Sequence, residues 1–320
     1  MRTALVLAAG AALVPMASGL ITPEELRLTG GTGLASVVSS WSVVDKVIAG
    51  YLAVSGPALA IGMVQNAHVV GPWSKFAIGY AFKMPCSART GKPGHTCACM
   101  TFESVQFAVC IDLCEHSDSL TRRTGMLIKY VPALCLAAHW SISHRFDAVT
   151  ALISTHFAKR ILEVLVLHDF SGSPTEEAPV SLVVGGFYAM VTWLFMRDGA
   201  RTGAHAVAGG AVLGFVGMIG NLYHHVLLRR LRSNAVPGAA KQYHVPRGGL
   251  FEFVACPHYF FEIMTFVGAA CMTQTVHTFL VVFWVACMLS GRSVATTQWY
   301  VKRFGAEYPS SRRHIIPLLF

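Results

Sequence analysis

The chain has 320 residues, of which 54% are hydrophobic and only 13% are charged, and its formal net charge is +9. This composition excludes an ordinary soluble domain, in which charged residues make up about a quarter of the chain. Several apolar runs approach the roughly 20 residues that a helix needs to cross a bilayer. The sequence therefore predicts an all-α, polytopic membrane protein with about seven transmembrane helices.

We expect the seven spans at residues 47–69, 125–142, 148–167, 180–196, 204–227, 253–270 and 272–289. With these spans, sixteen Lys and Arg residues fall on one face of the membrane and six on the other. Such an asymmetry marks the basic face as cytosolic. The positive charge is therefore explained by topology, and no long basic run interleaved with aromatics predicts a nucleic-acid partner.

The first residues of the chain resemble a targeting segment. Residues 1–20 carry one Arg, an apolar stretch and then the small residues Ala17, Ser18 and Gly19. This pattern favours a secretory signal peptide, and a short extra membrane segment is the alternative. Residues 21–46, which are rich in Gly, Ser and Thr, indicate a linker that leads into a membrane domain over 47–320.

Residues 85–119 differ from their surroundings because they hold five of the nine cysteines, together with His95 and His116. A zinc site is conceivable from these residue types. The spacings Cys-x-Cys and Cys-x₃-Cys, however, are not the paired Cys-x₂-Cys of structural zinc sites. We therefore favour a poorly ordered insertion, and we assign no metal-binding residues in the chain.

Charged residues also occur within the third predicted span. On a helix, Lys159 and Glu163 are four residues apart and face each other, so an ion pair that fixes helix packing is one interpretation. Arg160 remains as an extra charge that needs an anion. Ionisable side chains at membrane depth are functional candidates, and Tyr130 in the second span lies at a similar depth beside Pro132.

Polar residues are densest between residues 220 and 300. Asn221 and His225 are four apart on one helical face, which basic residues continue, and guanidinium groups match phosphate oxygens in bidentate geometry. Gly248 and Gly249 would allow close approach of a ligand to the backbone, or would simply form a turn. Neither a G-x-G-x-x-G motif after a strand nor a P-loop motif is present, so a nucleotide would bind among helices and cytosolic loops.

Six stretches from here to the end of the chain carry a family resemblance: residues 221–225, 228–232, 243–251, 256–263, 291–292 and 299–317. Together they resemble the steroid 5-alpha-reductase family (3-oxo-5-alpha-steroid 4-dehydrogenase, C-terminal domain). Residues 156–164 are also similar to the very-long-chain trans-2-enoyl-CoA reductase branch. The resemblance covers a core of residues 122–320.

The resemblance implies a seven-helix enzyme of the endoplasmic reticulum that uses NADPH to reduce a carbon–carbon double bond conjugated to a carbonyl in a lipid. It implies no protein partner that could be named. By position, it implies cofactor contacts at ten residues: Arg160, Asn221, His225, Arg232, Tyr243, His244, His258, Glu262, Arg292 and Tyr300. His225, His244 and His258 differ in residue type from the family pattern, and Thr296 stands where a family histidine is common.

The largest departure concerns the catalytic pair. Steroid-reducing members hold the substrate carbonyl with a Glu in the second span and a Tyr in the third. Here Tyr130 aligns best with the Glu position, and Phe157 occupies the Tyr position. Because Phe157 cannot donate a hydrogen bond, we expect Tyr130, whose phenol can donate and accept, to be the catalytic residue.

Two other functions remain open. Phe157 favours a non-catalytic membrane protein that retains the cofactor pocket. An integral membrane methyltransferase is the less favoured alternative, suggested by Pro257, His258 and Tyr259 followed by Glu262. Binding of NADPH or of S-adenosylmethionine would separate these functions, whereas the sequence does not choose between steroid, polyprenol and acyl-CoA substrates.

Overall fold

The computed structural model describes residues 41–65, 119–144, 146–168, 176–233 and 243–320. The expected signal segment 1–20, most of the linker 21–46 and nearly all of the Cys-rich segment 85–119 lie outside the described residues. The described part holds seven α-helices: α4 (Val43–Gln65), α7 (Arg122–Ser143), α8 (Ala148–Leu162), α9 (Ala178–Asp198), α10 (Ala204–Ser233), α11 (Pro257–Thr273) and α12 (Val276–Phe304).

Short elements complete this fold. A π-helical turn, η1 (Glu163–Leu167), continues α8, and two 3₁₀ turns, η2 (Gly249–Glu252) and η3 (Gly305–Glu307), flank α11 and α12. The strands β1 (Ser119–Leu120) and β2 (Glu176–Glu177) form one antiparallel pair of two residues each. Apart from this small pair, the described chain is helical, as the sequence predicts.

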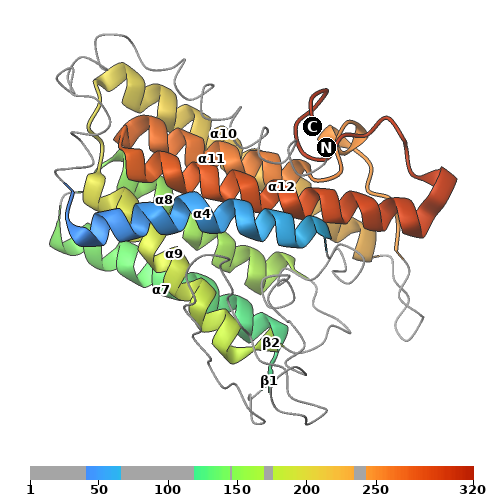
Figure 1. Ribbon diagram of the computed structural model, residues 1–320, viewed down its shortest axis with the longest axis horizontal. Helices are drawn as coiled ribbons and strands as arrows, with labels where there is room; N and C mark the ends of the chain where they lie inside the picture. The colour runs from blue at the N-terminus through green and yellow to red at the C-terminus, as the bar shows by residue number, and fades with distance from the viewer. Residues whose placement is uncertain (1–40, 66–118, 145, 169–175, 234–242) are drawn as a thin grey trace.

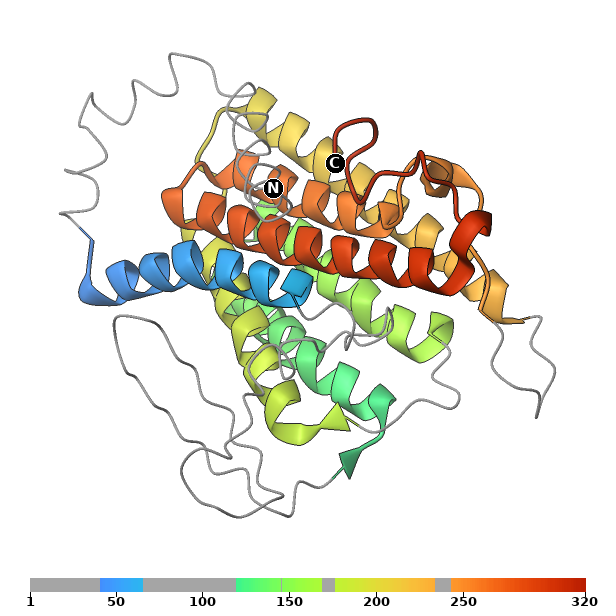
Figure 2. The same ribbon diagram turned by 45° about the vertical axis from the view of Figure 1, so that its right-hand side comes forward.

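The helices pack mainly in three pairs. α10 lies along α11, α12 lies along α4, and α7 lies along α9. Figure 1 shows α4, α10, α11 and α12 with their axes roughly parallel, and α7 and α9 tilted against them. α8 contacts helices of both groups, α7 and α9 on one side and α10 and α11 on the other, and Figure 2 shows the same arrangement from a second direction. Side chains of α8 can therefore reach residues from most of the bundle.

Four of the described helices are long and apolar enough to cross a membrane: Arg122–Ser143, Val180–Asp198, Ala204–Leu231 and Val276–Glu307. The chain is therefore a multi-pass membrane protein. With 15 and 17 residues, α8 and α11 are shorter than the roughly 20 residues of a typical span. The full count of seven spans stays a prediction.

The predicted boundary between the last two spans, at residue 271, is wrong. α11 continues to Thr273 and ends at Gln274, whose φ of 52° is left-handed, and the Thr275 side chain then caps α12 by accepting from Thr278 N. α12 also runs well past the predicted end at Leu289. Ser290, Gly291 and Ser293 are buried within α12. These small residues pack inside the protein, so they do not mark a loop, and Arg292 and Tyr300 lie on one helix.

Glycines allow α10 and α11 to approach closely. A Cβ on Gly217 would lie 2.6 Å from Thr265 N and 2.7 Å from Phe261 O, and a Cβ on Gly268 would lie 2.4 Å from Gly210 O. Any larger residue at these positions would push the helices apart. The small residues of α10 therefore allow the two helices to pack closely.

The C-terminal tail folds back onto the segment that precedes α11. Ala255 N donates to Arg313 O at 2.8 Å, Arg313 N donates to Phe253 O at 2.9 Å, and Cys256 N donates to His314 O at 3.1 Å. The tail and the start of α11 therefore lie together at one end of the bundle.

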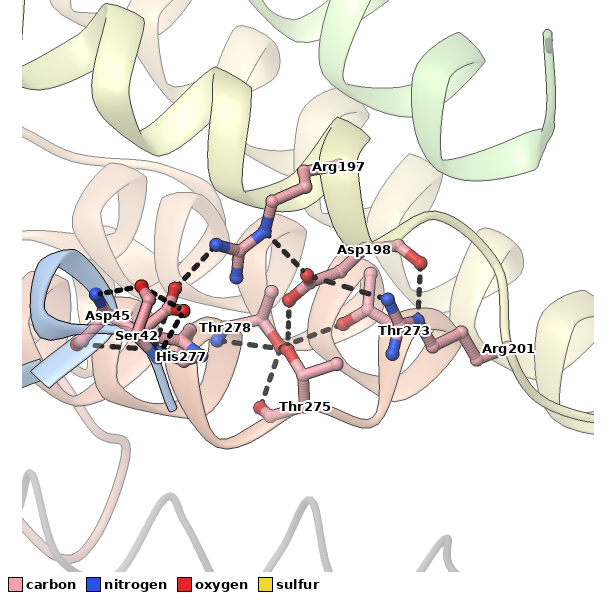
Figure 3. Close-up of polar contacts among 9 residues, drawn as sticks. All are labelled: Ser42, Asp45, Arg197, Asp198, Arg201, Thr273, Thr275, His277 and Thr278. Carbon is pink, nitrogen blue, oxygen red and sulfur yellow. Dashed lines mark hydrogen bonds and ion pairs between the residues drawn. The ribbon is translucent and has the colours of Figure 1, made fainter. Parts of the chain in front are cut away.

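A polar network joins α4 and α9 to the start of α12 (Figure 3). Arg197 Nη1 lies 2.6 Å from Asp45 Oδ1, and Arg197 Nε lies 3.0 Å from Asp198 Oδ1. Thr275 Oγ1 donates to Asp198 Oδ2 at 2.5 Å, and His277 Nε2 lies 3.7 Å from Asp45 Oδ1. The hydrogen bond from Arg197 holds the pKa of the Asp45 carboxyl below its usual range.

Candidate functional site

The buried side chain of Arg160 on α8 connects three helices. Its Nη2 donates to the Tyr130 hydroxyl on α7 at 2.8 Å, and its Nη1 lies 2.7 Å from Glu163 Oε2. The same Nη1 lies 3.4 Å from His225 Nδ1 on α10. Only 4% of the Arg160 side chain is exposed. A buried charge is costly unless it is paired, so this site is either a strong structural anchor or a binding site.

Glu163 is shared among several donors. Its Oε1 lies 2.9 Å from Lys159 Nζ and 3.1 Å from His225 Nδ1. Lys159 also donates to Asn221 Oδ1, and the Asn221 amide in turn donates to the backbone oxygen of His258 at 2.8 Å. The polar cluster defined by these contacts consists of Tyr130, Lys159, Arg160, Glu163, Asn221 and His225. The predicted pair of Lys159 and Glu163 is confirmed, but it forms part of a network across helices.

Arg160 Nε and His156 Nδ1 are buried and form no hydrogen bond within the described part of the chain. Both side chains are almost fully buried. An unsatisfied buried polar atom usually costs about 1–3 kcal/mol. A bound ligand with acceptor oxygens would satisfy Arg160 Nε, so the orphaned atom points to a ligand at the cluster.

Tyr130 lies inside the bundle with 4% of its surface exposed, so its side chain contacts protein on all sides. Its ring stacks on Tyr188 of α9 with the centroids 5.5 Å apart, and the Arg160 guanidinium lies 5.1 Å from its centroid. Phe157 is fully buried and contacts the same Tyr188 ring at 5.8 Å. The two positions implied by the resemblance therefore flank one aromatic residue.

Residues of α11 and α12 lie next to this cluster. The rings of His225 and His258 are 5.4 Å apart, and Glu262 acts electrostatically on Arg160. Arg292 Nε donates to the Tyr259 hydroxyl at 3.2 Å, and its guanidinium lies 5.7 Å from the Tyr259 ring centroid. An arginine and a phenol from two helices thus repeat the arrangement of Arg160 and Tyr130.

The remaining residues implied by the resemblance lie nearer the tail. The Tyr243 ring contacts Trp299 at 5.2 Å, Tyr300 stacks on Tyr308 at 5.5 Å, and His244 is exposed. Arg232 lies in the last turn of α10, and its side chain is outside the described part of the chain. The structure therefore gathers Tyr130, Arg160, Asn221, His225 and His258, and it places Tyr243 and Tyr300 against aromatic neighbours.

Gly248 and Gly249 form a turn at the start of η2. Gly248 and Gly249 have positive φ values of 88° and 54°, and a Cβ on Gly249 would lie 2.8 Å from His224 Nε2. Gly248 N donates to Glu252 Oε1 at 2.7 Å, and this bond lowers the pKa of the Glu252 carboxyl. The turn is thus set by local contacts, and the amide of Gly248 already has a partner.

Sequence reasoning assigned no role to Tyr188 and His168 in this region. Tyr259 lies within the stretch 256–263 that carries the resemblance, but its contact with Arg292 was not predicted. His168 follows Glu163 by five positions, and its amide donates to Glu163 O at 2.7 Å in the π-turn. An α-helical period does not bring residues five apart onto one face, so helical periodicity gave no signal for His168.

The chain is similar in sequence to one family model and to several known proteins. Residues 181–320 match the model of the family described as 3-oxo-5-alpha-steroid 4-dehydrogenase. The chain is 33% identical over 174 residues to a very-long-chain enoyl-CoA reductase of Dictyostelium discoideum, which covers 52% of this chain and 55% of that protein. It is 40% identical over 111 residues to 3-oxo-5-alpha-steroid 4-dehydrogenase 1 of Homo sapiens, which covers 35% of this chain and 41% of that protein.

A plant protein is similar over the same length. A steroid 5-alpha-reductase of Gossypium hirsutum is 37% identical over 111 residues, with 35% of this chain and 42% of that protein covered. The chain thus spans about half the length, or less, of the curated relatives it matches. The match to the enoyl-CoA reductase is longer than residues 181–320, so it includes residues before the family domain.

Proposed function

We propose that this chain is a lipid reductase that depends on NADPH, because residues 181–320 match the model of the family described as 3-oxo-5-alpha-steroid 4-dehydrogenase. Its substrate would carry a carbon–carbon double bond conjugated to a carbonyl. The enzyme would lie in the endoplasmic reticulum membrane, with the C-terminal tail and the loop between α10 and η2 in the cytosol, where NADPH is supplied.

The observation that carries this proposal is the polar cluster itself. Arg160, Glu163 and His225 form a buried network inside an otherwise apolar bundle, and Arg160 Nε lacks an acceptor there within the described residues. A purely structural ion network would satisfy each of its buried donors. The orphaned donor favours a ligand that brings oxygen acceptors, such as the amide or phosphate oxygens of a dinucleotide.

The donor set fits NADPH, which supplies a hydride when bound. Arg160, Arg292 and Arg232 offer guanidinium groups, and Asn221 and His225 offer neutral polar atoms beside them. Arginine suits phosphate because its planar fork donates two parallel hydrogen bonds. These residues would hold and orient the cofactor, and the surrounding apolar helices would exclude water from the reacting atoms.

Tyr130 is the residue that would donate to the substrate carbonyl in this proposal. Arg160 donates to the phenolic oxygen of Tyr130, so the Tyr130 O–H does not need to donate to Arg160 and is available for another acceptor. Reduction at the carbon beta to a carbonyl places negative charge on the carbonyl oxygen. A fixed donor there lowers the barrier, and Arg160 would hold the phenol in place.

An enoyl thioester is the favoured substrate class within this proposal. Phe157 removes the hydroxyl that the resemblance implies for steroid-reducing members, and the similarity to an enoyl-CoA reductase extends over 174 residues, against 111 residues for the human and cotton steroid reductases. A steroid or polyprenol enone is the second class. The non-catalytic alternative, a protein that binds NADPH without turnover, is favoured by Phe157 alone.

A binding and turnover panel tests the proposal. The purified full chain in detergent would be titrated with NADPH, NADH and S-adenosylmethionine, and then supplied with a long-chain trans-2-enoyl-CoA, a steroid enone and a polyprenol enone. We expect NADPH binding and NADPH oxidation with the enoyl-CoA. NADPH binding without oxidation on any substrate would support the non-catalytic alternative, and S-adenosylmethionine binding without NADPH binding would support a methyltransferase.

A further inference from the structure

We propose that Glu163, His168 and His225 form a binding site for a divalent transition-metal ion, with Zn²⁺ as the preferred ion. One ligand atom from each residue lies within 4.8 Å of the other two. Glu163 Oε1 and His225 Nδ1 are already 3.1 Å apart, and the rings of His168 and His225 are 5.5 Å apart. Two imidazoles and one carboxylate make up a ligand set that zinc uses in proteins when one coordination position stays open.

The π-turn η1 creates this arrangement. In an α-helix, residues five apart point in different directions, but the bond from His168 N to Glu163 O at 2.7 Å closes a wider turn. That turn returns the chain at His168 to the vicinity of Glu163, where α10 supplies His225. Such π-turns are rare and frequently occur at functional sites.

Burial at the site suits an ion that enters from one side. Glu163 and His225 are buried, whereas His168 is half-buried. Because His168 is partly exposed, it is the ligand that an entering ion would meet first. Small side-chain rotations would bring the three ligand atoms to zinc bonds of about 2.0–2.2 Å.

The neighbouring cations Lys159 and Arg160 weaken such a site by repelling a metal ion. Each of them nevertheless keeps another acceptor if Glu163 Oε1 binds the metal. Lys159 keeps Asn221 Oδ1 as an acceptor if Glu163 Oε1 turns to the metal. Arg160 keeps both Glu163 Oε2 and the Tyr130 hydroxyl. The excess positive charge makes the site weaker than a structural zinc site, and therefore a site of reversible occupancy.

The test is a metal titration of the full chain in detergent, stripped with chelator and free of NADPH. Zn²⁺ would be titrated against a chromophoric chelator, and Co²⁺ would be followed by its visible absorption. We expect one Zn²⁺ that is lost, or bound more than about tenfold more weakly, in His168→Asn. His139→Asn, which changes an exposed histidine of α7, should bind as the wild type does.

The Cys-rich segment 85–119 also carries metal-binding residue types, so the ligand atoms must be identified. X-ray absorption of the bound zinc should show a shell of nitrogen and oxygen that is absent from His168→Asn. A shell containing sulfur, with equal zinc binding by wild type and His168→Asn, would overturn the proposal. Absence of any zinc binding by the wild type would overturn it as well.

Competition with the cofactor is a consequence that rests on the proposed function, because His225 is both a proposed metal ligand and a proposed cofactor contact. NADPH should displace the zinc that depends on His168. Zinc that binds with the expected dependence on His168 but is not displaced by NADPH would leave the metal site standing and would contradict the placement of the cofactor beside His225.

Discussion

Arg160 donates a hydrogen bond of 2.8 Å to the hydroxyl of Tyr130, across the interface between α8 and α7. Because the arginine is the donor, the phenol retains its own proton for a further acceptor. Tyr130 is buried, and Tyr188 supports its ring by stacking. The phenol is therefore held in one orientation before any substrate binds, as electrostatic preorganisation requires.

Tyr130→Phe tests the proposed catalytic role because it removes one hydroxyl and little volume. We expect turnover to fall about 100–1,000-fold, as is typical for the loss of one oxyanion donor, whereas the NADPH dissociation constant should barely change. Tyr223→Phe, on an exposed tyrosine of α10, is the matched control and should retain wild-type turnover. Wild-type turnover in Tyr130→Phe would contradict the assignment.

Phe157→Tyr tests whether the missing phenol at position 157 limits activity on steroid enones. Phe157 and Tyr130 both contact the ring of Tyr188, so a phenol at position 157 would lie in the same region as the Tyr130 hydroxyl. We expect this variant to gain or increase activity on steroid enones, measured as NADPH oxidation and reduced product. No change on any enone, with the variant folded and NADPH bound, would argue that the position has no part in substrate selection.

Cofactor choice is expected to depend on Arg232, which the family resemblance associates with the cofactor. Arg232→Ala should weaken NADPH binding about ten- to a hundredfold, since a hydrogen bond to a charged group contributes about 1.5–3 kcal/mol. NADH binding should change far less, because NADH lacks the extra phosphate. Arg229→Ala, on an exposed arginine of the same helix, serves as the control. Equal affinity of the wild type for NADPH and NADH would count against the prediction.

Membrane orientation gives a prediction that is independent of activity. The tail and the segment before α11 are hydrogen-bonded to each other, so they share one side of the membrane. A glycosylation acceptor placed within residues 234–242 should remain unmodified if that side is cytosolic. An acceptor with a spacer inserted between Arg201 and Gly203, in the connection from α9 to α10, should be modified. The reverse pattern would place the tail and the loop between α10 and η2 on the side of the membrane opposite to cytosolic NADPH.

The ion pair of Asp45 and Arg197 predicts a pH dependence of stability. The pKa of Asp45 is lowered in the folded state, chiefly by the hydrogen bond from Arg197. A carboxyl of this kind stabilises the fold above its ordinary pKa of about 4, and the contribution is lost as the pH falls through the folded value. Asp45→Asn should therefore have a lower Tm than wild type at pH 7, and the difference should shrink below about pH 4. A difference independent of pH would indicate that the ion pair contributes nothing.

Helix content and the pairing of Lys159 with Glu163 could be predicted from the sequence because both follow local periodicity. The glycine-lined contact of α10 and α11 could be predicted for the same reason. The end of α11 was misplaced, since the left-handed Gln274 and the Thr275 cap outweigh the hydropathy pattern at residue 271. His168 was missed because a π-turn brings it to Glu163. The stacking of Tyr188 on Tyr130 and the hydrogen bond from Arg292 to Tyr259 join different helices. One sequence does not reveal contacts of this kind.

The measurement that tests the central claim most directly is transfer of deuterium from NADPH labelled at the nicotinamide C4. Purified chain would be incubated with the labelled cofactor and a long-chain trans-2-enoyl-CoA, with a steroid enone in parallel, and the products would be analysed by mass spectrometry and NMR. The proposed function predicts one deuterium on the carbon beta to the carbonyl, in a yield that Tyr130→Phe sharply reduces. Bound NADPH that transfers no deuterium to either substrate would contradict the claim that this chain is a reductase.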